Sequence, residues 1–410
     1  MCPHMGIDIL LATVGLLGVA VAALSAKMRR LPISEPLLGL IAGVLIGPAA
    51  LDALQLPPIT EETTLVHEVS RVLLAVSVMA VALRYRADVL KHLWRPLALL
   101  LLVAMPGMAL VTGALSWLLL AVPFASAALL GAALCPTDPV LASSVVTGED
   151  AERDLPARNR QLLSLESGAN DGLALPLVLA AVAIAGGMSA GAAALESLWQ
   201  VLGAVGFGAA AGFAGGKALR WGEKYGATDA APALFFTVVL ALGILGVSGI
   251  LHVDGILSVF VGGLLFNVAG TGADRTAEVP IDEAINRFAV LPLFVLLGAA
   301  LPWEAWTALG WGGIGLAVAV LLLRRLPLLL LLRRPLTLTT PDALYLGWFG
   351  PVGVSALFYL TMEADRLGID ETVLAAGTLV LVASTVAFGL TGVVGRALYA
   401  KSAASAPAAP

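Results

Sequence analysis

The sequence predicts an all-α polytopic membrane protein, and three observations support this fold class. First, 59% of the 410 residues are hydrophobic. Second, only 12% are charged, against about 25% in a soluble domain. Third, apolar stretches of about 20 residues, enough to cross a hydrocarbon core about 30 Å thick, recur along the whole chain. This composition excludes a disordered chain, a nucleic-acid-binding protein and an ordinary soluble enzyme as descriptions of the whole protein.

About thirteen transmembrane helices are expected from the length of these stretches. They lie near residues 7–25, 35–53, 69–85, 97–120, 123–146, 159–184, 199–219, 232–250, 254–269, 283–301, 311–332, 343–362 and 372–396. Residues 1–401 are expected to form a single transmembrane domain, and the Ala-, Ser- and Pro-rich residues 402–410 a disordered tail. The first span ends in small residues, as a cleaved signal peptide does. However, no basic residue precedes it and a basic cluster follows directly, so we expect it to be retained.

The basic residues predict the orientation of the chain. With the N-terminus outside, nineteen of the 23 Lys and Arg residues fall in inner loops or at the adjoining span ends, and only Arg366 lies in an outer loop. Cytoplasmic loops carry this kind of excess. We therefore expect a multi-pass protein of the inner or plasma membrane, with its N-terminus outside and its C-terminus in the cytoplasm. Two Cys and four scattered His residues indicate neither a disulfide framework nor a His-ligated metal.

Two spans carry helix-breaking residues. In the fifth, Pro136 and Pro139 flank Asp138, and each proline removes a backbone donor, so the helix must open there. Asp followed by Pro is also a helix start. A simple proline kink is the alternative interpretation. The twelfth span is interrupted over 347–353 by three Gly and one Pro, and it runs opposite to the fifth. Such a pair indicates an inverted-repeat transporter with its site at the midplane.

The sixth span concentrates oxygen-bearing side chains. Glu166 and Asn170 are four residues apart and share one stripe of the helix, while Ser167 and Asp171 share the adjacent stripe. Ionisable groups inside a membrane are costly and therefore indicate function. This ligand set suits a hard monovalent cation.

The motifs Pro136-Thr137-Asp138-Pro139 and 166–172 together resemble those of the monovalent cation/proton antiporters of the NhaP and Na⁺/H⁺ exchanger type. The stretch 347–359 is similar to the form found in fungal plasma-membrane Na⁺/H⁺ antiporters. The resemblance covers essentially all spans. It implies an inverted-repeat antiporter fold with two broken, crossing helices, and a homodimer.

Residue roles follow from the resemblance. It implies that Asp171 alternately binds the cation and a proton, beside Asn170, with Ser167 in the ligand sphere. Thr137 and Asp138 then belong to the crossover and complete the cation ligands. The resemblance also implies a structural ion pair between Glu166 and an arginine of the eleventh span. Arg325 aligns best, and Arg324 is the alternative. No cofactor is expected beyond the transported ions.

Two positions depart from the family pattern: residues 77–82 of the third span lack an acidic residue, and Val352 stands where many relatives have a basic one. Because Asn170 rather than an acid precedes Asp171, the site has one titrating carboxyl, which favours electroneutral 1:1 exchange of Na⁺ or Li⁺ for H⁺. The alternatives are K⁺/H⁺ exchange, a cation channel and a solute symporter. An intramembrane aspartyl protease is disfavoured because its Gly-x-Gly-Asp signature is absent.

Overall fold

The computed structural model describes residues 3–28, 31, 33–85, 87–227, 230–269 and 288–404. Over these ranges the regular structure is helical, without strands, which confirms the all-α fold class. Seven helices there are long and apolar enough to cross a membrane: Met5–Ala23, Thr64–Arg84, Asp88–Leu120, Ala157–Ile184, Ala190–Lys224, Trp303–Leu332 and Glu371–Ser402. Shorter apolar helices lie between them, and one of these, Phe124–Ala133, belongs to the interrupted fifth span. The number of thirteen crossings therefore stays a prediction.

The first half of the chain contains α1 (Pro3–Ala23), α2 (Ser25–Met28), α3 (Glu35–Ile46), α4 (Thr64–Arg84), α5 (Ala87–Leu99), η1 (Leu100–Ala104), α6 (Met105–Leu120), α7 (Phe124–Ala133), α8 (Pro139–Val146), α9 (Gly148–Asp154), α10 (Ala157–Leu173) and α11 (Leu175–Ile184). The second half contains α12 (Ala190–Lys224), α13 (Ala230–Ile250), α14 (Gly255–Ala269), a helix over Phe288–Ala299, α16 (Trp303–Leu323), α17 (Leu326–Leu332), α18 (Thr340–Trp348), α19 (Val354–Leu367) and α20 (Glu371–Ala404).

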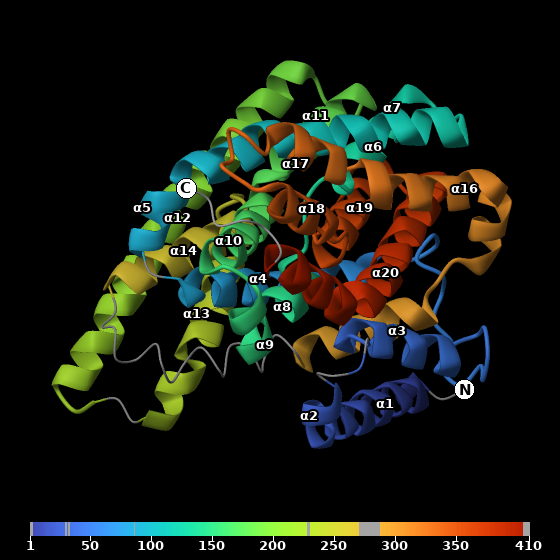
Figure 1. Ribbon diagram of the computed structural model, residues 1–410. Helices are drawn as coiled ribbons and strands as arrows, with labels where there is room; N and C mark the ends of the chain where they lie inside the picture. Colours follow the sequence, from blue (N-terminus) through green and yellow to red (C-terminus); the bar gives the residue numbers. More distant parts are fainter. Residues whose placement is uncertain are drawn as a thin grey trace.

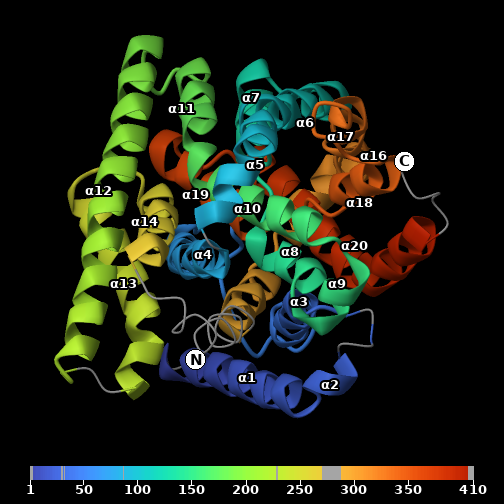
Figure 2. The ribbon, with the colours of Figure 1, turned by 60° about the vertical axis from the view of Figure 1, so that its left-hand side comes forward.

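The helices form two groups with α4 and α10 between them. Figure 2 shows α12, α13 and α14 together on one side, and α6, α16, α17, α18 and α20 on the other. The first group packs closely because Gly208 and Gly212 of α12 lie directly against the backbone of α14, where a Cβ atom would collide. Figure 1 shows α10 near the middle of the molecule, and it contacts α8, α18, α4 and α14. The sixth span is thus in contact with both groups.

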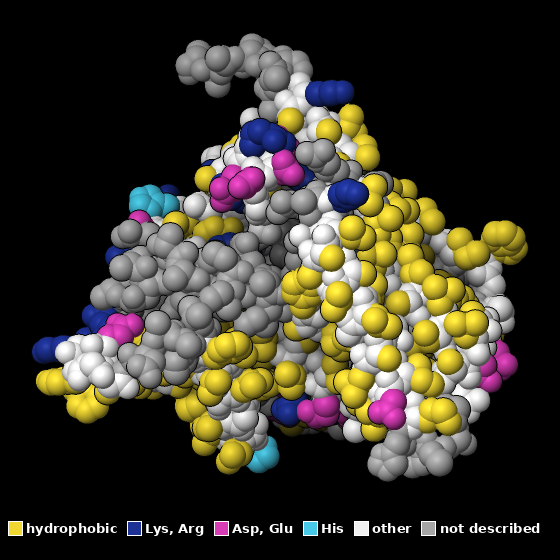
Figure 3. All heavy atoms as spheres, turned by 90° about the horizontal axis from the view of Figure 1, so that it is seen from below, with side chains coloured by type: hydrophobic (Ala, Val, Ile, Leu, Met, Phe, Trp, Pro, Cys, Tyr) yellow, Lys and Arg dark blue, Asp and Glu magenta, His cyan; other side chains and the backbone are white. Residues whose placement is uncertain are grey.

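The distribution of polarity is that of a protein in lipid. Asp138 and Asp171 are fully buried, whereas Trp311 is 87% exposed and Leu110 is 75% exposed. On the face in Figure 3, hydrophobic side chains cover a broad area, and most of the charged ones lie around it. A bilayer accounts for this pattern, because apolar side chains lose nothing by facing lipid while buried polar groups must be satisfied inside.

Several helices begin or end at other residues than the sequence predicts. The twelfth span continues to Leu367, five residues beyond its predicted end, and α4 begins at Thr64 rather than at residue 69. α20 continues to Ala404, so the first three residues of the predicted tail are helical. The rest of that tail, 405–410, and the predicted start of the tenth span, 283–287, lie outside the described residues. The division into one domain and a tail stays a prediction.

Candidate functional site: a buried carboxyl beside two crossing broken helices

The fifth span opens where its prolines predict. α7 ends at Ala133 and α8 begins at Pro139, with 134–138 unwound between them. The prolines cannot donate to the preceding turn, so the backbone here turns to other partners. The N–H of Asp138 donates to the carbonyl oxygen of Pro351, 3.0 Å away. This bond joins the unwound segment of the fifth span to that of the twelfth, so the two broken helices cross.

The glycines of the twelfth span make this crossing possible. α18 ends at Trp348 and α19 begins at Val354. A Cβ atom on Gly353 would lie 2.6 Å from Cγ of Asp138, and one on Gly350 would collide with the side chain of Arg325. Both glycines are therefore needed for the twelfth span to approach Asp138 and Arg325 closely.

Asp138 caps both half-helices that begin at the crossing. Its Oδ1 accepts from the N–H of Leu141 in α8 at 2.8 Å, and its Oδ2 accepts from the N–H of Ser355 in α19 at 3.2 Å. Helix N-termini carry a partial positive charge, so one carboxylate balances two of them. Both oxygens are engaged in this way.

Arg324 binds the C-terminal ends of the two half-helices, α7 and α18, that end at the crossing. Its guanidinium donates to the carbonyl oxygens of Leu134 at 2.5 Å and Pro136 at 3.1 Å, beyond the end of α7. It also donates to the carbonyl oxygen of Gly350, just after α18. Helix C-termini carry a partial negative charge. The structure thus directs Arg324 to the crossing rather than to Glu166.

The polar residues of α10 face the unwound segment of the fifth span. Nδ2 of Asn170 donates to Oγ1 of Thr137 at 2.8 Å, and the N–H of Thr137 donates to Oδ1 of Asn170 at 3.3 Å. Oγ of Ser167 lies 3.1 Å from Oγ1 of Thr137. The structure therefore brings three of the predicted site residues into one hydrogen-bonded cluster.

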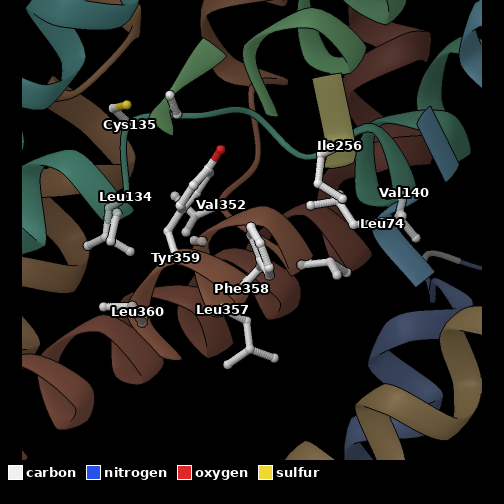
Figure 4. Packing of buried hydrophobic residues seen from close by; sticks show 14 of the residues in the cluster. Leu74, Leu134, Cys135, Val140, Ile256, Val352, Leu357, Phe358, Tyr359 and Leu360 are labelled. Carbon is white, nitrogen blue, oxygen red and sulfur yellow. The ribbon is translucent and has the colours of Figure 1, made fainter. Parts of the chain in front are cut away.

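Asp171 differs from every neighbour in this cluster. Its side chain is fully buried, and neither carboxylate oxygen has a hydrogen-bond partner in the part of the chain that the structure describes. Its main-chain carbonyl accepts from the hydroxyl of Tyr359 in α19. Figure 4 shows Tyr359 and Leu357 leaving α19 on opposite sides, with the Tyr359 hydroxyl directed towards the unwound chain beyond Cys135. Two free carboxylate oxygens are chemically able to hold either a proton or a cation.

Glu166 and Arg325 form a buried ion pair. Nη1 and Nη2 of Arg325 donate to Oε1 and Oε2 of Glu166 at 2.5 and 2.7 Å, and the two side chains are only 3% and 1% exposed. Nε of Arg325 donates to the carbonyl oxygen of Leu346 at 2.9 Å. The arginine therefore links α10 to the start of α17 and to α18.

The buried polar groups Ser355, Glu363 and Asp254 are not among the predicted site residues. Ser355 and Glu363 lie on α19, and Asp254 caps α14 through the N–H of Leu257 at 2.9 Å. Glu363 lies one residue beyond the predicted end of the twelfth span at residue 362, whereas α19 continues to Leu367. Searching one turn beyond each predicted span end would have found it.

Among the described residues, no group of three or more His, Cys, Asp and Glu is arranged to hold a metal ion. The cluster of Thr137, Ser167 and Asn170 instead offers hydroxyl and amide oxygens. Such oxygen donors suit hard cations.

These features define the class of membrane protein to which the chain belongs. Two broken helices that cross beside a buried, unpartnered carboxyl are typical of secondary transporters with a site at the midplane. The chain is therefore a multi-pass membrane protein of the transporter class.

Comparison with known proteins identifies the family. Residues 16–398 match the model of the transmembrane sodium/hydrogen exchanger family, and the chain belongs to this family. It is 33% identical over 354 residues to the Na⁺/H⁺ antiporter 2 of Zygosaccharomyces rouxii, which covers 83% of this chain and 44% of that protein. The chain thus spans less than half the length of this relative. It is 26% identical over 346 residues to the K⁺/H⁺ antiporter NhaP2 of a Shewanella species, covering 82% of this chain and 58% of that one.

The fold is also that of a solved antiporter. The electron-microscopy structure of the sodium proton antiporter MjNhaP1 from Methanocaldococcus jannaschii superposes with a TM-score of 0.75 over 98% of this chain and 97% of that one, at 20% identity. The predicted antiporter fold is confirmed by this match.

Proposed function

We propose that this protein exchanges Na⁺ or Li⁺ for H⁺ across the plasma or inner membrane, with its N-terminus outside and its C-terminus in the cytoplasm. The observation that carries the proposal is Asp171: a fully buried carboxyl with two free oxygens, beside the cluster of Asn170, Thr137 and Ser167. The name of the 33% identical yeast relative supports the choice of ions.

Exchange follows from exclusive occupancy of one carboxyl. A cation that binds Asp171 needs the carboxylate and displaces the proton, and protonation removes the charge that holds the cation. In either case the site crosses the membrane neutralised, which avoids the cost of moving a bare charge through a low-dielectric interior. Ser167 and Thr137 supply further oxygen ligands to the cation, whereas Asp138 contributes mainly by holding the two helix N-termini together.

Alternating access requires the crossing to move as one unit. The hydrogen bonds of Asp138, Arg324 and the Glu166–Arg325 pair tie the fifth, sixth, eleventh and twelfth spans together. We propose that this unit moves against α4 and the group of α12 to α14, which forms the dimer scaffold. One titrating carboxyl per protomer gives a 1:1, electroneutral cycle.

The test is exchange by purified protein in proteoliposomes that carry a pH gradient. Addition of Na⁺, Li⁺ or K⁺ is followed with a pH-sensitive dye, with and without valinomycin and K⁺ to clamp the membrane potential. We expect Na⁺ and Li⁺ to dissipate the gradient, at a rate that the clamp leaves unchanged. Asp171→Asn is expected to abolish exchange, since Asn cannot trade a proton for a cation, while Glu304→Gln, at an exposed position, leaves it intact.

Other results would assign another function. Wild-type-like exchange by well-folded Asp171→Asn would move the site elsewhere, and cation flux without proton release would indicate a channel or symporter. A response to K⁺ alone would favour K⁺/H⁺ exchange, the activity named for the Shewanella relative. A rate that depends on the clamp would contradict the 1:1 cycle.

A further inference from the structure

A second buried acid lies on α19, outside the cluster around Asp171. Glu363 is 2% exposed, and neither of its carboxyl oxygens has a hydrogen-bond partner among the residues that the structure describes. An ionised carboxylate in such a place costs far more than a neutral one, because nothing replaces the water it has lost. Glu363 therefore holds a proton in this conformation and can give it up only when water or another base reaches it.

Its position links it to the exchange site. Ser355, Tyr359 and Glu363 are four residues apart on α19 and share one face. At the crossing end of this polar stripe, the N–H of Ser355 bonds to Asp138, and the buried Oγ of Ser355 has no partner among the described residues. In the middle, the Tyr359 hydroxyl bonds to the main-chain oxygen of Asp171. Glu363 lies about 6 Å further along the helix, towards Leu367, the end that the proposed topology places outside.

Among the described residues, the helices packed around Glu363 supply no basic partner for its carboxyl group. α19 packs against α4, α7, α11 and α20. α7 and α11 carry no titratable residue at all. From α4, His67 points to Thr361, with 2.9 Å between Nδ1 and Oγ1, and Glu68 pairs with Arg71 at 2.8 Å.

The remaining charges nearby are also engaged or exposed. On α19 itself, Arg366 pairs with Glu196 at 2.7 Å, and Asp365 is half exposed near His67. At the start of α20, Asp370 accepts from Ser126 at 3.0 Å, and Glu371 is exposed. No basic side chain of the described residues forms an ion pair with Glu363.

We propose that Glu363 is the outer proton-relay group of the exchanger. When the site opens outwards, the carboxyl of Glu363 gives its proton to the carboxylate of Asp171, through water held along the Ser355–Tyr359 stripe. The Glu363 carboxylate then regains a proton from the outer solution, and in the opposite direction of transport both steps reverse. The relay binds no cation and rests on the proposed exchange function.

The test compares Glu363→Gln with wild type, with Glu363→Asp as the conservative variant and Glu371→Gln as the exposed control from the same end of the bundle. Two quantities are measured. One is the proton release that Na⁺ causes in purified protein in detergent, which reports on Asp171 alone. The other is the exchange rate in everted membrane vesicles, whose lumen contacts the outer face, as the lumenal pH is varied.

We expect Glu363→Gln to release protons on Na⁺ addition as wild type does. Its exchange rate should fall to about one tenth of the wild-type rate or below, and the dependence of that rate on lumenal pH should change. Glu363→Asp should restore part of the rate, because it keeps a titrating group, and Glu371→Gln should match wild type. If Glu363→Gln does not fold, the same shift of the lumenal pH profile is required of Glu363→Asp.

Three results would overturn the relay. An unchanged rate and pH profile would remove Glu363 from the route. Loss of Na⁺-dependent proton release would place Glu363 inside the exchange site instead. An equal loss of rate in the Gln and Asp variants with an unaltered pH profile would make its role structural. Failure of the exchange proposal itself is distinct, since wild-type protein would then release no protons.

Discussion

The adjacent residues Arg324 and Arg325 of the eleventh span bind different kinds of partner. Arg324 donates to main-chain carbonyls at the ends of two half-helices, whereas Arg325 donates to the carboxylate of Glu166. The two side chains diverge because the helix stops at Leu323 and restarts at Leu326, which places both arginines in the break between α16 and α17. Both side chains are buried.

Removal of one partner of the Glu166–Arg325 pair should destabilise the protein. Either Glu166→Gln or Arg325→Leu leaves a buried charge without compensation, at a typical cost of about 3–5 kcal/mol, whereas replacement of both can be nearly neutral. We expect both single variants to lower the thermal unfolding midpoint in detergent and the double variant to recover much of the loss.

The matched control for this cycle is the neighbouring arginine. Because Arg324 contacts carbonyl oxygens and not Glu166, Arg324→Leu should couple to Glu166→Gln much more weakly than Arg325→Leu does. Additive effects in the Arg325 cycle, or strong coupling in the Arg324 cycle, would contradict the arrangement. Glu166 would then become a candidate second titrating carboxyl, and 1:1 exchange would no longer follow.

At the scale of elements, the unwound segments are stable because polar groups replace the lost helical bonds. The carbonyls freed at the end of α7 accept from Arg324, and the first N–H groups of α8 and α19 donate to Asp138. Unwound backbone at membrane depth is tolerated only under such conditions. The glycines of the twelfth span contribute space rather than flexibility.

Gly353→Ala tests the need for space at the crossing. The added Cβ would lie 2.6 Å from Cγ of Asp138 and 2.7 Å from its Oδ2, so the carboxylate must move away from the helix N-termini. We expect a stability loss of about 1–3 kcal/mol and strongly reduced exchange. Gly206→Ala, in α12 with nothing within 4 Å of the added Cβ, should fold and transport normally. Equal behaviour of the two variants would refute the steric argument.

The start of α18 provides a stability contribution that depends on pH. Asp342, just before the predicted twelfth span, accepts from Thr339, Tyr399 and Asn159 at 2.6 Å each. Partial burial raises the pKa of the Asp342 carboxyl, but these hydrogen bonds outweigh it and hold the pKa below its ordinary value of 3.8. A pKa lowered on folding stabilises the folded state above the unfolded value and loses that effect as the pH falls through the folded one.

Asp342→Asn should therefore lower the thermal unfolding midpoint by a constant amount between pH 5 and 8. The gap, meaning the difference in midpoint between wild type and variant, should narrow as the pH falls below about 4. Thermal unfolding in detergent across this pH range measures the gap. A gap that does not change with pH would show that the charge of Asp342 is unimportant. Glu304→Gln, at an exposed position, serves as the control.

At the scale of the whole molecule, the two ends of the bundle must lie on opposite sides of the membrane. His252, in the turn before α14, and Ser402, near the end of α20, are both exposed. The proposed topology places His252 outside and Ser402 in the cytoplasm. This assignment follows from the distribution of Lys and Arg.

Single cysteines test the orientation. In a Cys2→Ser background, where the remaining Cys135 is buried, His252→Cys should react with a membrane-impermeant maleimide added to intact cells. Ser402→Cys should react only after the membrane is opened. The reverse pattern would invert the topology, and it would also move Glu363 to the cytoplasmic side of Asp171. Labelling of both positions from one side would contradict the odd number of spans, five, that is predicted between them.

The features that depend on near neighbours in the chain are predictable from the amino-acid sequence. Apolar stretches indicate the spans, Pro136 and Pro139 indicate where the fifth opens, and the spacing of 166–171 places four polar groups on one face of a helix. These follow from backbone chemistry and periodicity, which act within a few residues. The packing of distant helices settles which groups meet across the bundle. Asp138 caps α19 as well as α8, and Arg324 donates to main-chain carbonyls at the crossing. Asp171 and Glu363 have no hydrogen-bond partner among the described residues. These contacts across the bundle join residues that are far apart in the chain, so the backbone chemistry and periodicity of a single helix do not determine them.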